Sequence, residues 1–336
     1  MAFSNTEEPM RPIRIILSTA ALLGATLPSM HASAQVAVAN ANDTSRVDDV
    51  NAPKPASAHD AILRAQILLE RAHFSPGEID GASGSNSRRA IAGYQASQGL
   101  TASGELDAQT WAALDRDAGP ALIRYTLVDA DVAGPFVAIP DDMMEKAQLP
   151  ALGYATVQEA LGEKFHASPK LLQSLNPDSS FAAGEEIVVP NINGVPELPR
   201  ADKVVVDRSD ATVSLVDAAG RTYAQFPATM GSEHDPLPIG EWKIRGVARN
   251  PAFHYNPALF WDADPAHSKA TIAPGPNNPV GVVWIDLSKD HYGIHGTPEP
   301  ATVGKTQSHG CIRLTNWDAL ALSQAVAPGT VAILQE

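Results

Sequence analysis

The sequence predicts a multidomain protein with three folded parts: a small all-α module of three helices, an α+β segment, and a mainly β, sandwich-like domain. Three observations carry this prediction. The chain has 336 residues, which is long enough for two or three domains. Apolar residues recur at helical spacing between residues 59 and 118. From residue 201 to the end, short β-like runs alternate with turn residues.

The composition is that of a soluble globular protein, with 44% hydrophobic and 18% charged residues. The formal net charge is −14 at pH 7. Proteins that bind nucleic acid or an anionic membrane surface through broad electrostatic contact present a basic face. We therefore expect no nucleic-acid partner.

The N-terminus has the features of an export signal. Arg11 and Arg14 precede an apolar run at residues 15–27, and Ala32 and Ala34 stand where a signal peptidase requires small residues. The apolar run is shorter than the roughly 20 residues of a transmembrane helix. We predict a signal peptide over residues 1–34, a periplasmic mature protein, and no membrane span after cleavage.

Residues 35–58 lack sustained periodicity and are rich in Ala, Asn, Asp and Pro, which predicts a flexible linker. From residue 59 to residue 118, amphipathic segments alternate with glycine-containing turns. Asp107 or Thr110 is the expected N-cap of the last segment. These features predict a module of three helices.

This module resembles the peptidoglycan-binding domain family. The likeness covers the whole of residues 59–118 and consists of three consecutive motifs of turn, helix and cap residues. These are formed by Phe74, Pro76, Gly77, Ile79, Asp80, Gly81 and Gly84, by Tyr94, Gln95, Gly99 and Leu100, and by Gly104, Leu106, Asp107, Thr110 and Trp111. The resemblance implies that the module binds the cell wall and that peptidoglycan is the partner.

Residues 120–198 predict an α+β segment. They contain two short helical patterns, an Asn176-Pro177 turn, and an apolar β-like run that ends at Pro190. The segment resembles a degenerate LysM wall-binding module whose first strand covers residues 125–132, with an insertion at residues 135–153. Both a spacer or packing role and glycan recognition are open for it, because likeness of fold does not define a site.

Residues 201–336 predict the mainly β domain. One convincing helix covers residues 316–327, with Thr315 or Asn316 as the expected N-cap and Pro328 and Gly329 as its stop. The expected strands are three runs between residues 203 and 231, and further runs at 242–248, 280–287 and 330–334. We expect the chemistry of this domain on its loops.

Cys311 is the only cysteine of the chain. A single thiol in an exported protein cannot form an intramolecular disulfide, so it is buried, paired between molecules, or reactive. Zinc binding by Cys311 with His291, His295 and His309 is an alternative, but one thiolate without a CxxC pair makes a poor structural site. The predicted export, the loop context and the two preceding histidines, His295 and His309, favour a reactive thiol. We expect no metal and no cofactor.

A nucleophilic thiol needs a base within about 2.6 to 3.2 Å. His309 stands two residues before Cys311, on the same side of an extended segment, although Gly310 makes a turn equally compatible. His295 stands sixteen residues upstream, and the intervening loop can bring it across. Spacing alone leaves the choice between the two histidines open.

Both stretches, IHGT at residues 294–297 and SHGCIRL at residues 308–314, resemble the L,D-transpeptidase (YkuD) catalytic domain family. The likeness covers most of residues 201–336. The resemblance implies that Cys311 is the nucleophile, that His295 is its base, and that the backbone carbonyl of Gly296 orients His295. It also implies that the backbone amides of Gly310 and Cys311 form the oxyanion hole.

Three further roles follow for the neighbouring residues. His309 is expected to support the site, and Ser308 to shape the loop. Arg313 is expected to order the loop or to meet a substrate carboxylate, and pairing with Asp318 is its alternative role.

The resemblance implies an exported L,D-transpeptidase. Its thiol attacks a tetrapeptide stem, releases D-alanine, and transfers the resulting thioester to an amine, making 3-3 cross-links. The acceptor stays open between a second stem, a lipoprotein lysine, a free D-amino acid and water. The alternatives are therefore a carboxypeptidase or hydrolase and, from another class, a non-catalytic wall-binding protein. The resemblance also implies that a carbapenem acylates Cys311.

Overall fold

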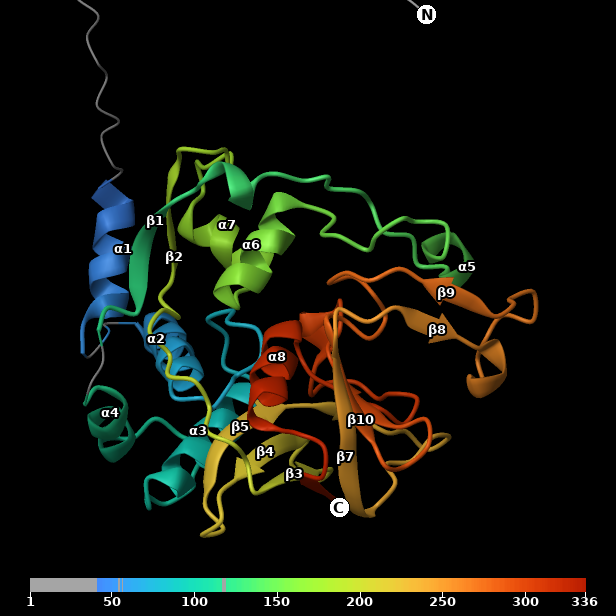
Figure 1. Cartoon of the computed structure of the whole chain (residues 1–336). Helices are drawn as coiled ribbons and strands as arrows, with labels where there is room; N and C mark the ends of the chain where they lie inside the picture. The colour runs from blue at the N-terminus through green and yellow to red at the C-terminus, as the bar shows by residue number, and fades with distance from the viewer. Residues whose placement is uncertain (1–40, 54, 56, 117–118) are drawn as a thin grey trace, which may run out of the picture. The chain divides into compact units, whose positions relative to one another are not determined.

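The computed structural model describes residues 41–53, 55, 57–116 and 119–336 (Figure 1). The predicted signal peptide lies outside these residues. In the described part of the chain, no helix is long and apolar enough to cross a membrane.

Three helices build the N-terminal module, which confirms the predicted all-α part. They are α2 (Ala58–Arg71), α3 (Ser85–Ser97) and α4 (Ala108–Leu114). Asp107 is the N-cap of α4, because its carboxylate accepts a hydrogen bond from the backbone amide of Thr110 at 2.7 Å. Leu69 of α2 and Ile91 of α3 are buried in the small core between the helices.

Part of the predicted flexible linker is a helix, so that prediction was wrong for residues 41–51. Helix α1 (Ala41–Asn51) buries Val50 completely, in one apolar cluster with Leu63 and Leu122. The side chain of Asn51 exchanges two hydrogen bonds with the backbone of Leu122, at 2.8 and 3.0 Å. Contacts with residues far along the chain stabilise α1, and local sequence patterns do not predict such contacts.

The middle segment pairs β1 (Leu122–Thr126) with β2 (Glu186–Pro190) in antiparallel order. The elements between them are η1 (Asp129–Asp131), α5 (Met143–Lys146), α6 (Val157–Phe165) and α7 (Pro169–Leu175). The first strand therefore begins earlier than predicted and ends at Thr126. It ends there because Asp131 accepts hydrogen bonds from the Tyr125 hydroxyl and the Val128 amide, which closes the chain into a 3-10 turn.

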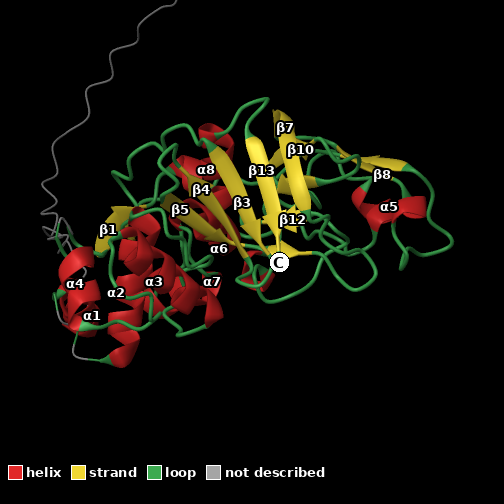
Figure 2. Cartoon of the chain, turned by 90° about the horizontal axis from the view of Figure 1, so that it is seen from below, coloured by secondary structure: helices red, strands yellow, loops and turns green. Residues whose placement is uncertain are grey.

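The C-terminal domain is built on a mixed sheet, in which nine strands are found among the described residues. In spatial order they are β5 (Thr222–Pro227), β4 (Thr212–Val216), β3 (Lys203–Asp207), β13 (Val331–Gln335), β7 (Gly240–Arg249), β10 (Val283–Leu287), β11 (Gly293–His295), β12 (Ile312–Arg313) and β6 (Thr229–Met230). Figure 2 shows β4, β3, β13, β7 and β10 side by side.

One core joins the two halves of this sheet. The long strand β7 belongs to both halves, pairing with β13 on one side and β10 on the other. Val206 and Phe226 from the first half share a single buried cluster with Ile285 and Ile294 from the second half. Two halves that enclose one core confirm the predicted mainly β, sandwich-like domain.

Helix α8 (Asn316–Ala325) packs on this core through Ala319 and Leu322. Thr315 is its N-cap, since its hydroxyl accepts from the backbone amide of Asp318 at 3.1 Å. The start of α8 also meets the N-terminal module, where the Ser75 hydroxyl donates to the buried carboxylate of Asp318 at 3.0 Å. The helical module is thus bonded to the β domain, in contact with α8.

Candidate active site

The candidate active site lies where β11 and β12 run side by side. The strands pair in parallel, with Ile294 opposite Ile312 and His295 opposite Arg313. Side chains alternate along a strand, and both isoleucines are fully buried in the core. Cys311 directly precedes β12, so alternation puts its side chain on the same face of the sheet as that of His295.

His295 is a neutral imidazole with one nitrogen free. Its Nδ1 donates to the carbonyl of Gly296 at 2.6 Å, so Nε2 of the neutral ring keeps its lone pair. The buried ring stacks on Trp284 with the centroids 5.5 Å apart. Burial, and then the charge of Arg313, lowers the pKa of His295 to about 4. At neutral pH the side chain is uncharged and can accept a proton at Nε2.

The thiol of Cys311 is partly buried, and its Sγ lies 3.6 Å from the backbone carbonyl oxygen of His291. Burial raises the pKa of this thiol, and the charge of Asp235 raises it further, whereas the Gly293 amide and Arg313 act in the opposite direction. The effects that raise the pKa outweigh those that lower it, so the thiol is protonated at neutral pH. Attack by this sulfur requires a base that removes its proton.

Hydrogen bonds among the described residues do not include one between the His295 ring and Sγ of Cys311. Catalytic hydrogen bonds are often long before substrate binds. The alternative zinc set is not assembled either, because no group of three or more His, Cys, Asp or Glu in the described part of the chain is placed to hold a metal ion. The geometry thus offers a thiol and a neutral imidazole on one face of two paired strands.

The loop before Cys311 is held in a fixed shape. The Ser308 hydroxyl donates to the carbonyl of Cys311 at 2.6 Å, and the Ser308 amide donates to the carbonyl of Gly231 at 3.2 Å. Gly310 has φ +95°, and a Cβ there would lie 2.9 Å from Cε1 of Tyr292, so only glycine fits. Backbone hydrogen bonds of the described loops do not use the amides of Gly310 and Cys311. Both amides are available to a developing oxyanion.

A two-stranded segment contacts this loop. It runs from β8 (Phe253–Tyr255) through η2 (Pro257–Leu259) to β9 (Ala270–Ile272), and we call residues 253–272 the lid. His309 donates from Nε2 to Oδ1 of Asp262 in the lid at 2.8 Å. The edge of its ring meets Phe260 at a centroid distance of 5.3 Å. His309 is therefore engaged by the lid.

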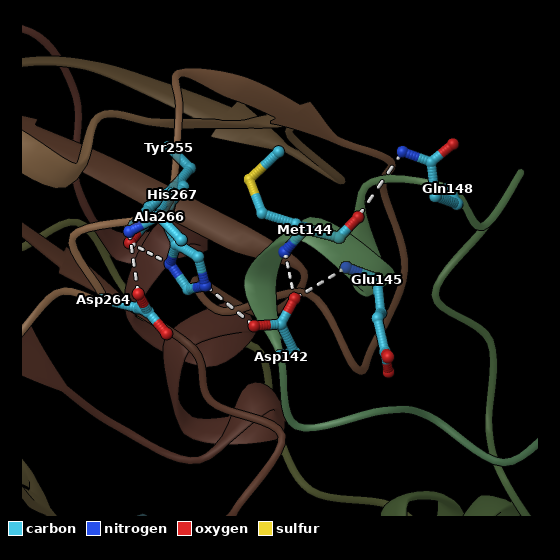
Figure 3. A network of polar contacts seen from close by, with 8 residues as sticks. All are labelled: Asp142, Met144, Glu145, Gln148, Tyr255, Asp264, Ala266 and His267. Atoms are coloured by element: carbon cyan, nitrogen blue, oxygen red, sulfur yellow. Dashed lines mark hydrogen bonds and ion pairs between the residues drawn. The ribbon is translucent and has the colours of Figure 1, made fainter.

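The lid is fastened in turn to the insertion at residues 135–153. His267 of the lid donates from Nε2 to Asp142 at 2.7 Å and accepts at Nδ1 from the Tyr255 hydroxyl at 2.9 Å (Figure 3). Asp142 also caps α5, since its other oxygen accepts from the backbone amides of Met144 and Glu145. Sequence reasoning assigned His267 no role, because its partner Asp142 lies 125 residues away.

Arg313 keeps its guanidinium available. It is partly buried, and the ion pairs of the described residues do not include it. Burial lowers its pKa, while Cys311, Glu299 and Asp262 raise it. The alternative pairing with Asp318 does not form in the structure, because Asp318 is buried at the start of α8 against Ser75. Asp235 and Asp262 are site residues that sequence reasoning missed, since neither stands in a motif beside Cys311.

Two domain families match this chain. Residues 201–334 match the family described as "L,D-transpeptidase catalytic domain", and residues 58–114 match the family described as "Putative peptidoglycan binding domain".

Curated relatives agree with the catalytic-domain match. The chain is 31% identical over 173 residues to "Putative L,D-transpeptidase YkuD" of Bacillus subtilis, which covers 51% of this chain and 88% of the relative. It is 28% identical over 145 residues to "Putative L,D-transpeptidase YqjB" of the same organism, which covers 41% of this chain and 74% of the relative. L,D-transpeptidase 3 from Mycobacterium tuberculosis, solved with a faropenem-derived adduct, aligns with a TM-score of 0.32 at 20% identity. That alignment covers 40% of this chain and 59% of the solved chain. By its 31% identity to a relative of which it spans 88%, and by its catalytic-domain match, the chain belongs to the L,D-transpeptidase family of enzymes.

Proposed function

We propose that this enzyme is an exported, periplasmic L,D-transpeptidase that joins peptidoglycan stem peptides through an acyl-enzyme at Cys311. The parallel pairing of β11 and β12 carries this proposal, because it puts a neutral His295 with a free Nε2 on the same face as the thiol. The two domain matches, one catalytic and one peptidoglycan-binding, support peptidoglycan as the substrate.

The first step transfers the donor stem to the enzyme. Sγ of Cys311 attacks the carbonyl that joins the third-position diamino acid to the terminal D-alanine, while Nε2 of His295 takes the thiol proton. The backbone amides of Gly310 and Cys311 bind the oxyanion that forms. As the carbon–nitrogen bond breaks, the imidazolium returns the proton to the departing amine. D-alanine leaves, and the stem stays as a thioester.

The second step transfers the stem to an amine. The side-chain amine of the third residue of a neighbouring stem attacks the thioester carbonyl, and Nε2 of His295 removes its proton. Collapse of the second oxyanion expels the sulfur, which recovers its proton from His295. The product is a 3-3 cross-link, and the enzyme returns to its starting state.

The remaining site residues position these groups. The Gly296 carbonyl fixes the tautomer and orientation of His295, and Ser308 holds the loop that carries the thiol. His309 ties that loop to the lid. The guanidinium of Arg313, which forms no ion pair with the described residues, suits a substrate carboxylate, because its planar fork can bind both carboxylate oxygens.

The helical module is proposed to hold the enzyme on the insoluble wall, which raises the effective concentration of stems at Cys311. Its bonds to the β domain, including Ser75 to Asp318, keep the two parts together. The segment between them is proposed to act as a packing element, because its insertion is bonded to the lid.

The test is mass spectrometry of tetrapeptide-bearing muropeptides incubated with protein that begins at Gln35, with Cys311→Ala as the matched control. The proposal predicts a product with the mass of two stems less one D-alanine, absent with the variant. A single stem shortened to a tripeptide indicates a hydrolase. Unchanged masses, with binding to sacculi intact, indicate a wall-binding protein. Added lipoprotein or D-amino acid identifies a different acceptor if it is the species that gains the stem.

A further inference from the structure

The loop after β6 carries a carboxylate whose charge acts on the thiol of Cys311. Strand β6 pairs with β12 in antiparallel order, with Met230 opposite Ile312. The loop then starts at Gly231, whose carbonyl accepts from the amide of Ser308, and ends at Leu237, which is buried in the core. Asp235 stands between these two anchors, and its charge acts on both Cys311 and Tyr292.

The shape of this loop is fixed by its own backbone. The amide of Ser232 donates to the carbonyl of Asp235 at 2.9 Å, and the amide of Asp235 donates to the hydroxyl of Ser232 at 3.0 Å. Gly231 has φ +55°, and a Cβ there would lie 2.7 Å from the amide nitrogen of Leu237. The backbone position of Asp235 is therefore set before any ligand binds.

Among the described residues, this carboxylate has no hydrogen-bond or ion-pair partner. Oδ2 of Asp235 is buried and makes no hydrogen bond with any described residue, and no ion pair of the described residues includes Asp235. A buried oxygen without a partner costs free energy. Beside a nucleophilic thiol its negative charge also opposes formation of the thiolate. Both costs are removed when a cation binds next to Asp235.

We propose that Asp235 binds the side-chain ammonium of the third-position diamino acid of the donor stem and so selects donors that carry this charge. The inference rests on the proposed function. The diamino acid contributes the carbonyl that Cys311 attacks, so its side chain is the substrate cation closest to the thiol in the first step. Once paired, Asp235 no longer opposes ionisation of the sulfur, and donor binding itself favours attack.

The test compares two tetrapeptide donors, one with the free side-chain amine at its third residue and one with that amine acetylated. The rate of D-alanine release, as kcat/KM, is expected to be about ten- to a hundredfold higher for the free amine, as for a hydrogen bond to a charged group. In Asp235→Asn this preference falls to within about threefold. The matched control Glu233→Gln, an exposed carboxylate on the same loop, keeps the preference.

Binding of both peptides to Cys311→Ala, measured by calorimetry, separates this inference from the proposed function. Tighter binding of the free amine to Cys311→Ala, lost in the double variant with Asp235→Asn, supports the role of Asp235 even if no turnover is found. Equal binding and equal release of D-alanine from the two donors overturns that role and leaves the transpeptidase proposal standing. Absence of D-alanine release from either donor overturns the proposed function alone.

Discussion

His295 and His309, the two candidate bases for Cys311, lie in different surroundings. In strand β11, His295 is 4% exposed, its ring is stacked on Trp284, and the ring Nδ1 donates to the carbonyl of Gly296. In the loop before β12, His309 is partly exposed and its Nε2 donates to Asp262 of the lid. Each ring has one bonded nitrogen, but that of His295 is bonded to the next residue of its own chain segment, whereas that of His309 is bonded to a carboxylate of the lid.

The difference teaches that strand pairing, and not distance along the chain, sets which histidine shares a face of the sheet with Cys311. His309 is two residues from Cys311 but belongs to the lid contact. His295 is sixteen residues away, yet the pairing of β11 with β12 brings it to the same face. The following predictions test the contrast between His295 and His309, starting with the largest expected effect.

Removal of the sulfur should abolish catalysis, whether His295 or His309 is the base. Cys311→Ala is expected to lower D-alanine release by about 10⁴-fold or more, because the variant lacks the sulfur that forms the proposed acyl-enzyme. Circular dichroism and binding to sacculi should match the unchanged protein. Substantial release by this variant would remove the nucleophile from the proposal.

Variants of the two histidines test directly which of them is the base. His295→Gln is expected to lower kcat/KM by about 10² to 10⁴-fold, the usual contribution of a general base. His309→Gln should lower kcat/KM by less than about tenfold, since the contacts that it loses are those with Asp262 and Phe260 of the lid. Steady-state release of D-alanine measures both. The reverse order would show that the histidine of the lid side is the base.

The pH dependence follows from the lowered pKa of His295. The base must be neutral to accept the thiol proton, and its pKa is about 4, so kcat/KM should hold between pH 7 and 5 and fall as the pH drops through 4. The unfolded chain binds this proton already below pH 6.5, so the free energy of unfolding should decrease as pH falls from 6.5 towards 4. An acid limb centred near 6.5 would contradict a buried, neutral His295. Denaturant titrations of His295→Gln, in which this loss is absent, provide the control for stability.

The smallest effect is expected where the lid meets the insertion. Asp142→Ala removes the bond to His267 and the cap of α5, and it should lower kcat/KM by a few-fold by loosening the lid that holds His309. Glu145→Gln, an exposed side chain on the same helix, is the matched control. Hydrogen exchange of residues 253–272 should rise in the first variant only, and unchanged exchange would mean that the lid is held by other contacts.

Local patterns predicted the parts of the protein that depend on neighbours in sequence. The cap of α4 by Asp107, the start of α8 at Thr315 and the β runs of the C-terminal domain are of this kind. Helix α1 was missed because its stability depends on Asn51 bonding to Leu122. For the same reason Asp235, Asp262 and the Asp142 contact escaped prediction, since the fold brings each of them to its place from a distant segment.

Acylation of Cys311 tests the central claim most directly, because it needs no natural substrate. Protein incubated with a carbapenem should gain the mass of one adduct per chain, and peptide mapping should find it on the fragment that contains Cys311. The rate of labelling should fall strongly in His295→Gln and little in His309→Gln. An unlabelled protein, under conditions that label a known relative, or an adduct on another residue, would contradict the account.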